Sequence, residues 1–123
     1  MTSLTNAMQK FIGENVCLIA TVSKDGCPNV APKGTFRVLD EKTLVYAEIY
    51  GQLTYQNLLA NPCVCVVAVN RQERAMVRCS GKAEIVTAGQ LYDEMAAQVE
   101  KRGLPRPQAV VKIALTEIRS SKI

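Results

Sequence analysis

Residues 16–37 read VCLIATVSKDGCPNVAPKGTFR and predict a strand, a turn and a second, interrupted strand. The opening VCLIATV is an apolar run rich in β-branched side chains, which is typical of a buried strand. The turn sequence SKDG at 23–26 then favours a hairpin. Residues 27–38 are extended by composition, but Pro28, Pro32 and Gly34 interrupt them, so we expect an irregular, bulged or edge strand there.

The rest of the chain alternates apolar runs with polar turns and predicts further strands and three helices. Apolar residues at helical spacing before Gly13 indicate a short amphipathic helix at 3–13. The sequence TAGQ at 87–90 fits a capping box for a helix that ends at Gly103. The other expected elements are strands at 43–49, 63–69, 75–85 and 109–118 and a helix that Thr54 caps and Pro62 stops.

This order of elements favours a mainly β, α+β fold. Short turns join consecutive strands, which favours antiparallel pairing. Six strands, several of them apolar on both faces, favour a closed or nearly closed barrel with three flanking helices. With 123 residues, 48% of them hydrophobic, the chain fits a single domain over 1–123.

The composition excludes several classes of function. The chain has no histidine, which excludes Ser-His and Cys-His nucleophile systems and histidine-containing zinc sites. It has no Trp, two Phe and four Tyr, too few aromatics for a nucleic-acid platform, so we expect no nucleic-acid partner. No apolar stretch approaches the roughly 20 residues that span a bilayer, and no signal-peptide pattern is found, so we expect a cytoplasmic protein without a membrane partner. The net charge of +4 suits an anionic small molecule or a polyanion.

Five cysteines, an odd number without a CxxC pair, predict no disulfide framework. Cys63 and Cys65 lie two apart in a predicted strand, so their side chains share one face, as a soft metal site would require. Their Val and Ala neighbours favour the alternative that both are small buried hydrophobic residues. A redox-sensing thiol would rest on Cys27 alone, and Asp25 near it does not favour a thiolate.

The interrupted strand carries the features of an anion site. Strand alternation would place Lys33, Thr35 and Arg37 on one face, with Gly34 allowing a ligand close to the backbone. The alternative is an exposed edge strand with ordinary solvated charges.

The junction between loop and helix at 50–57 is a second candidate for anion binding. Unpaired N–H groups at a helix amino terminus favour a phosphate, and Thr54 adds a hydroxyl. The alternative is that Thr54 is a plain N-cap. Both candidate segments flank the predicted strand at 43–49, so one ligand could contact both.

The order of elements, together with ATVSKDGCPNVAPKGTF, LVYAEIYGQLTYQNLLANPCVCV and VRCSGKAEIV, resembles the pyridoxamine 5′-phosphate oxidase-like family of flavin-binding split β-barrels over roughly residues 5–118. The likeness is greatest to the short bacterial FMN-binding proteins. It implies a six-stranded antiparallel split barrel and a homodimer with two FMN molecules at the subunit interface. The segment VRCSGKAEIV then contributes to the dimer interface and to barrel closure. No catalytic side chain is implied, because a flavin carries the redox chemistry itself.

Carried over by position, the resemblance implies cofactor contacts from two segments, with Thr54 at the phosphate and Lys33 as a candidate cation. The residues are Ala31, Pro32, Lys33, Gly34, Thr35, Glu48, Ile49, Gln52, Leu53 and Thr54. Backbone N–H groups within the segment Pro32 to Thr35 would stabilise the charge that develops on the ring when it is reduced.

One position departs from the family pattern. Many relatives carry Arg or Lys just before this Thr as a direct phosphate ligand, and here that residue is Leu53. A charge-assisted contact is stronger than a neutral one, so Lys33, Arg37 or a residue of the partner chain would have to replace it. Some relatives bind a deazaflavin or haem instead, and the absence of histidine argues against His-ligated haem.

The resemblance implies an FMN-binding flavoprotein, either a small oxidoreductase or an electron-transfer protein whose small-molecule or protein redox partner is unidentified. The alternative is a non-catalytic binding module whose cofactor site is lost or altered and takes a deazaflavin, another anionic ligand or a polyanion. Pyridoxine phosphate oxidase activity is not expected, because the chain ends in RSSKI without the extension of larger relatives.

Overall fold

The Asp-Gly turn closes the expected hairpin, in which β1 (Val16–Val22) pairs with β2 (Pro28–Lys33) in the computed structural model of residues 1–123. Gly26 in this turn has a φ of 87°, a conformation that glycine adopts without strain. Burial alternates along β1, where Cys17, Ile19 and Thr21 are buried and the residues between them are not. The hairpin therefore turns one face to the core and the other outward.

The structure contains seven strands and three helices, so the prediction of six strands is wrong. The expected strand at 27–38 is divided by a turn at Gly34 and Thr35 into β2 and β3 (Arg37–Asp40). The other elements are α1 (Asn6–Glu14), β4 (Thr43–Glu48), α2 (Leu53–Ala60), β5 (Cys63–Asn70), β6 (Ala75–Val86), α3 (Gln90–Lys101) and β7 (Ala109–Lys122).

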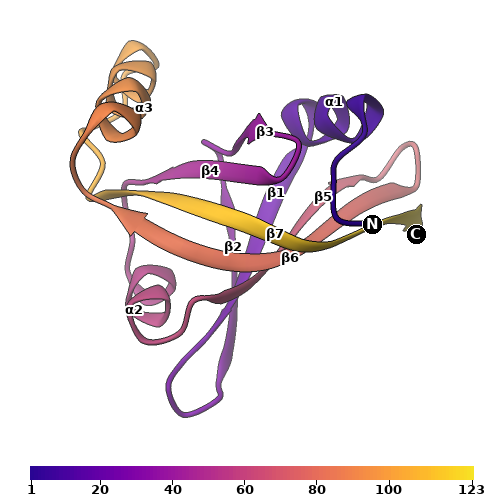
Figure 1. Cartoon of the computed structure of the whole chain (residues 1–123), viewed down its shortest axis with the longest axis horizontal. Helices are drawn as coiled ribbons and strands as arrows, with labels where there is room; N and C mark the ends of the chain where they lie inside the picture. Colours follow the sequence, from indigo (N-terminus) through magenta and orange to yellow (C-terminus); the bar gives the residue numbers. More distant parts are fainter.

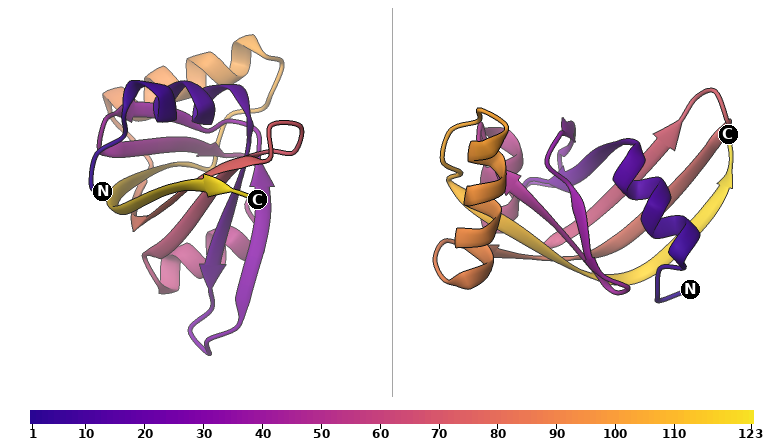
Figure 2. Two further views of the ribbon diagram at one scale, coloured as in Figure 1. Left: turned by 90° about the vertical axis from the view of Figure 1, so that its right-hand side faces the viewer. Right: turned by 90° about the horizontal axis from the view of Figure 1, so that it is seen from above.

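The two halves of the divided strand lie at opposite edges of one antiparallel sheet. The strand order is β2-β1-β5-β6-β7-β4-β3, so β2 pairs only with β1 and β3 only with β4. The sheet is strongly curved, with α1 and α3 above the long β6–β7 ribbon and α2 below it (Figure 1; Figure 2). Because its two edge strands do not pair, the sheet is open, and the expectation of a closed barrel is corrected.

Thr35 holds the division in place through its side chain. Its hydroxyl donates to the carbonyl oxygen of Ala47 and accepts from the amide of the same residue, both at 2.9 Å. These two bonds replace the backbone hydrogen bonds that a paired strand would make with β4, just after β2 ends. The turn is thus fixed to the strand that it approaches.

Two hydrophobic clusters cover the two faces of β4. The larger cluster fills the concave side of the sheet under α1 and includes Leu44 and Tyr46. The smaller cluster packs α3 against Val45, Ala47 and Val110. All residues of β4 are buried as a result, which places its carboxyl end inside the molecule.

Element ends differ from the predicted ones at four places. Thr5 caps α1, since its hydroxyl accepts from the amide of Met8. The α2 helix begins at Leu53 with Gln52 as N-cap, so Thr54 lies inside the helix and is not its cap. Gly89 caps α3 without a side-chain bond, and the capping box expected from Thr87 is therefore wrong. Strand β7 continues to Lys122, beyond the predicted end at 118, because β6 pairs with its last residues.

None of the three helices is long and apolar enough to cross a bilayer.

Replacing Thr35 by Val tests the role of its hydroxyl. We expect the free energy of unfolding, measured by urea denaturation, to fall by about 1–3 kcal/mol, because two backbone groups of Ala47 lose their partner. The matched control is Thr87→Val, an exposed threonine without a hydrogen bond, which should change the free energy of unfolding by less than about 0.5 kcal/mol. Equal effects of the two substitutions would contradict the assignment.

Candidate functional site

A small pocket of 170 Å³ lies where the end of β2, the turn after it and the end of β4 come together. Five predicted cofactor residues line it, which are Lys33, Gly34, Thr35, Glu48 and Ile49. Ala47, Tyr50 and Leu104 complete the lining. The structure thus brings together parts of the two predicted segments. The other five predicted residues do not line this pocket, and they are Ala31, Pro32, Gln52, Leu53 and Thr54.

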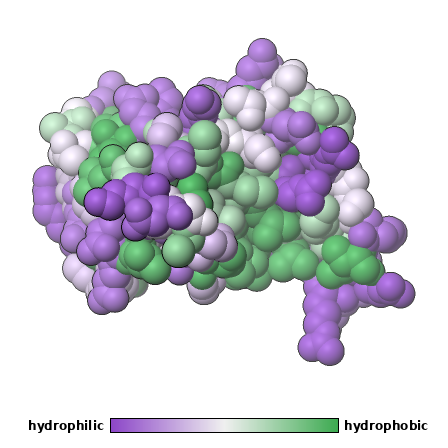
Figure 3. Space-filling view, turned by 90° about the horizontal axis from the view of Figure 1, so that it is seen from below, coloured by the Kyte–Doolittle hydropathy of each residue, from purple (hydrophilic) through white to green (hydrophobic).

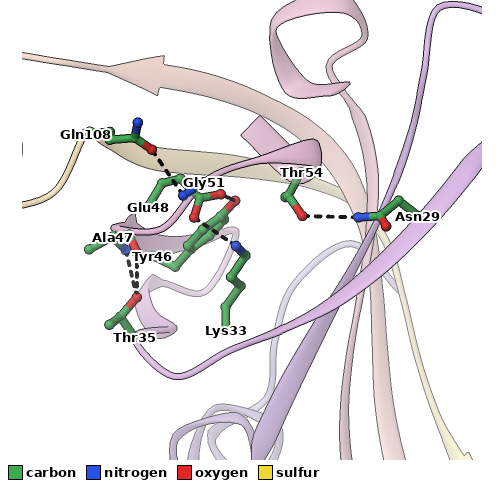
Figure 4. A network of polar contacts seen from close by, with 9 residues as sticks. All are labelled: Asn29, Lys33, Thr35, Tyr46, Ala47, Glu48, Gly51, Thr54 and Gln108. Carbon is green, nitrogen blue, oxygen red and sulfur yellow. Dashed lines mark hydrogen bonds and ion pairs between the residues drawn. The ribbon is translucent and has the colours of Figure 1, made fainter. Parts of the chain in front are cut away.

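A buried carboxylate forms the polar centre of this pocket. Glu48 is 1% exposed, and its carboxylate accepts from Lys33 Nζ at 2.8 Å and from the Tyr46 hydroxyl at 3.1 Å (Figure 4). Burial raises the pKa of Tyr46 far above its ordinary value, and the Glu48 charge and hydrogen bond raise it further, so the phenol stays a neutral donor. The charge of Lys33 is therefore offset within its own chain, although two of its three ammonium hydrogens remain for a ligand.

Arg37 does not share the pocket with Lys33, and the expectation that Lys33, Thr35 and Arg37 lie on one face is wrong. The chain turns at Gly34 and Thr35, which breaks the alternation of an unbroken strand. Arg37 pairs with Val45, whose side chain belongs to the cluster under α3. Its Nε is buried without a hydrogen-bond partner, and Arg37 is not among the residues that line the pocket.

The amino terminus of α2 lies beside the pocket and is tied to the hairpin. Thr54 is buried and its hydroxyl accepts from Asn29 of β2 at 3.3 Å (Figure 4). One turn later Asn57 donates to the buried hydroxyl of Thr21 in β1 at 3.1 Å. The N-cap Gln52 makes no side-chain bond to the helix, so the first amides of α2 lack a capping side chain.

Leu53, the first residue of α2, is half exposed and brings no charge. The position at which the resemblance leads us to expect a cation is therefore uncharged. Neither Lys33, which is paired with Glu48, nor Arg37, which packs toward α3, fills it.

Sequence reasoning missed three residues that shape the site. Gly51 allows the loop to pass over Glu48, because a Cβ there would lie 2.5 Å from the Glu48 side chain. Its amide donates to Gln108 Oε1 at 3.1 Å, while the Gln108 amide donates to the Glu48 carbonyl oxygen at 2.8 Å. Arg102 Nη1 donates to the Gly34 carbonyl oxygen at 3.2 Å. Gly51 could have been noticed as a glycine just before a helix, but Gln108 and Arg102 are distant in sequence and gave no signal.

The cysteines form neither disulfides nor a metal site. All five are free, and no three metal-ligating side chains come together. Cys27 is exposed. Cys63 is also exposed and Cys65 is partly buried, so the prediction that both are buried is wrong; they lie on the outward face of β5.

Comparisons with known proteins agree with the fold. The model of the pyridoxamine 5′-phosphate oxidase family matches residues 4–122. An uncharacterized protein of Methanocaldococcus jannaschii is 36% identical over 126 residues, which cover 99% of this chain and 83% of that protein. The crystal structure of HupZ from Group A Streptococcus superposes with a TM-score of 0.92 at 30% identity, covering 97% of this chain and 94% of that one.

Two solved structures share the fold at lower sequence identity. An FMN-binding protein from Syntrophomonas wolfei has a TM-score of 0.81 at 14% identity and covers 94% of this chain and 84% of its own. HutZ, a haem storage protein from Vibrio cholerae, has a TM-score of 0.71 at 21% identity, with 95% and 94% covered. At these identities the likeness concerns the fold alone.

The two buried thiols predict a loss of stability at high pH. Burial raises the pKa of Cys17 from 9.0 to about 11 and that of Cys79 from 9.0 to about 12. Below pH 9 both thiols are protonated in the folded and unfolded states, so stability is unaffected there. Above pH 9 the unfolded chain ionises first, and we expect the free energy of unfolding to fall between pH 9 and pH 11 by up to about 1.4 kcal/mol per pH unit for each thiol.

Urea denaturation at several pH values measures this slope. The double variant Cys17→Ala/Cys79→Ala should show a flatter dependence than the wild type, whereas Cys27→Ala, which removes an exposed thiol, should keep the wild-type slope. Parallel curves for the wild type and the double variant would refute the prediction.

Proposed function

The chain belongs to the pyridoxamine 5′-phosphate oxidase family, and on that premise we propose that it is an FMN-binding flavoprotein whose site includes the pocket between Lys33 and Glu48. The observation that carries the proposal is the meeting of Lys33, Gly34 and Thr35 with Glu48 and Ile49 beside the start of α2. Residues 31–35 and 48–54 are the segments in which the resemblance expects the cofactor.

The amino terminus of α2 fits the phosphate end of FMN. Its first amides lack a capping side chain, and N–H groups in that position bind anions. Thr54 adds a hydroxyl whose own hydrogen is unused, since the oxygen accepts from Asn29. Leu53 supplies no cation at this end, so one chain provides only part of a phosphate site.

The pocket itself fits the ring end of the cofactor. Lys33 keeps two ammonium hydrogens beyond the one that it donates to Glu48. Pro32 has no amide hydrogen, which leaves Lys33, Gly34 and Thr35 as the backbone donors of this segment. Tyr50 and Leu104 add aromatic and apolar surface. A bound FMN would supply the redox chemistry, and these residues would hold and orient it.

We propose a redox role for the protein, as a small oxidoreductase or an electron-transfer protein. Lys33, Glu48 and Tyr46 are hydrogen-bonded to one another, and the chain has no histidine to act as a general base near neutral pH. Five free thiols are consistent with the reducing interior of a cell, and we place the protein in the cytoplasm as part of this proposal.

We further propose that two copies assemble to complete the site. The pocket of 170 Å³ is smaller than the roughly 300–1,000 Å³ of typical ligand sites, so a single chain would leave most of an FMN uncovered. The outward face of the β1–β2 hairpin and of β5 carries apolar side chains that no helix covers, namely Leu18, Ala20, Val30, Cys65 and Val67. Apolar residues are gathered in the space-filling view between hydrophilic borders (Figure 3). Such a face is typical of an interface between subunits.

Haem is the second candidate ligand, because HutZ shares the fold. Haem iron takes an axial His, Cys, Met or Tyr ligand. The chain has no histidine, and no Cys or Met lines the pocket. Tyr46 is buried and donates to Glu48, which leaves Tyr50 as the one lining residue of a ligand type that haem iron takes. The residues at the pocket therefore favour FMN, or a deazaflavin, over haem.

Absorption spectra taken after addition of excess FMN and desalting test the flavin proposal. We expect a retained flavin spectrum and a dissociation constant that rises several-fold in Lys33→Ala and in Thr54→Ala, because each removes a polar contact at one end of the site. Lys24→Ala, an exposed lysine in the hairpin turn, is the matched control and should leave the affinity unchanged. A wild-type protein that retains no flavin would contradict the proposal and favour a binding module with an altered site.

Light scattering at micromolar concentration tests the assembly. We expect a dimer for the wild type and a monomer for Val30→Glu, which places a charge on the outward face of β2 at a side chain that is 61% exposed. Leu59→Glu, at a similarly exposed apolar residue of α2, should remain a dimer. A monomeric wild type would rule out the shared site.

A further inference from the structure

The ion pair between Lys33 and Glu48 is buried at the wall of the proposed ring site (Figure 4). The Glu48 side chain is 1% exposed and that of Lys33 15%, and their charged atoms lie 2.8 Å apart. Removing two charges from water costs about as much free energy as their attraction returns, so a buried pair adds little to stability. Ionisable groups that are buried beside a cleft with a specific charge partner are typical of a functional site.

The loop after β4 keeps water away from the Glu48 carboxylate. Gly51 passes so close that a Cβ there would lie 2.8 Å from the carboxyl carbon of Glu48. Gln108 fixes this loop, because its side chain accepts from the Gly51 amide at 3.1 Å and its own amide donates to the Glu48 carbonyl oxygen at 2.8 Å. Shielded in this way, the carboxylate interacts strongly with the ammonium group of Lys33.

Two bonds fix the position of the carboxylate. Lys33 Nζ donates to Glu48 Oε2 at 2.8 Å, and the Tyr46 hydroxyl donates to Oε1 at 3.1 Å. The ammonium is also 5.9 Å from the centre of the Tyr46 ring, which attracts a cation. Each charged group is therefore held beside the other from two sides.

The wall that would face the ring has no net charge, although it contains a lysine. Among the residues that line the pocket, only Lys33 and Glu48 are charged. Tyr46 adds no charge, because burial holds the pKa of its phenol far above the ordinary value. Arg102 donates to the Gly34 carbonyl oxygen at 3.2 Å, but its side chain is exposed, so water and salt screen its charge.

The net charge of this wall matters for the chemistry that a flavin supplies. At mildly alkaline pH, uptake of two electrons and one proton leaves the ring with one negative charge. A cation beside the ring stabilises that charge and raises the reduction potential, whereas a neutral ion pair does not. Lys33 without its partner would be such a cation.

We propose that Glu48 is a positioning residue that cancels the charge of Lys33 at the flavin ring and so lowers the reduction potential of the bound FMN. The inference rests on the proposed function and deepens it, because a reduced cofactor of lower potential is the stronger electron donor. It gives the redox role a direction that neither the pocket nor the family resemblance supplies.

Binding of oxidised FMN, and of FMN reduced by excess dithionite without oxygen, tests the effect of the charge. The ratio of the two dissociation constants reports the shift of the reduction potential on binding. In Glu48→Gln, whose amide can accept from Lys33 and donate to Tyr46, the preference for reduced over oxidised FMN should rise about tenfold, or about 30 mV for a two-electron couple. Glu73→Gln makes the same change of charge in the exposed turn before β6 and should leave the preference unchanged.

The double variant Lys33→Met/Glu48→Gln tests whether Glu48 acts through Lys33. With neither charge present the wall is neutral again, so the preference should return to the wild-type value while both dissociation constants rise. Glu48→Met makes the same change of charge with an apolar side chain of similar length and should match Glu48→Gln. The result then does not depend on the folding of one variant.

The outcomes separate the inference from the proposed function. If the wild type binds FMN and neither substitution at Glu48 changes the preference, the inference falls alone. A double variant that keeps the raised preference would also overturn it, because Glu48 would then not act through Lys33. If the wild type binds neither form of FMN, the proposed function falls and the inference falls with it.

Discussion

The hydroxyl of Thr35, bonded to both backbone groups of Ala47, holds the point where one extended segment becomes two strands. At this contact the chain stops pairing with β1 and begins to pair with β4. As a result, β2 and β3 lie at opposite edges of the sheet. The pocket lies at this crossing. The openness of the sheet, the position of Lys33 beside Glu48 and the exposure of the outward face all follow from that division.

Local signals made most elements predictable. Turn chemistry and periodicity predict the hairpin at Asp25-Gly26, the apolar runs of β4 and β5, the alternation of β6 and the positions of three helices. The division after Lys33 was not predictable. Two prolines and a glycine indicate an irregular strand, but they do not indicate which neighbouring strand each half pairs with. The predicted helix caps at Thr54 and Thr87 are wrong. A capping motif in the sequence does not fix the residue at which the helix begins, because the backbone geometry there depends on the whole fold.

The site was predictable as two segments but not as a network. Sequence spacing and the family resemblance both drew attention to Lys33, Thr35 and Thr54. The bond between Lys33 and Glu48 joins residues of strands that are not paired with each other, and nothing local indicates it. The outward position of Cys63 was missed for a related reason, since a run of apolar residues does not tell which of its two faces the core will cover.

The pocket has no net charge, whereas two arginines of β6 and β7 lie close together elsewhere on the sheet. Lys33, Tyr46 and Glu48 satisfy one another, and removal of any one would leave a buried group without its partner. Such a wall offers hydrogen bonds without net charge and so suits the uncharged part of a ligand. Arg78 and Arg119 lie side by side on the outward face of the sheet instead, and Arg119 is paired with Glu117.

The α2 helix has an unusual attachment to the rest of the chain. Its buried side chains are Thr54, Asn57 and a single leucine, Leu58, so side-chain bonds to Asn29 and Thr21 do much of the holding. An eight-residue helix is not stable alone in water. It should therefore open on its own, ahead of the sheet, and its amides should exchange with solvent before those of the β1–β2 hairpin. A ligand that contacts both α2 and β2 would suppress this local unfolding. Binding would therefore slow the exchange of the α2 amides.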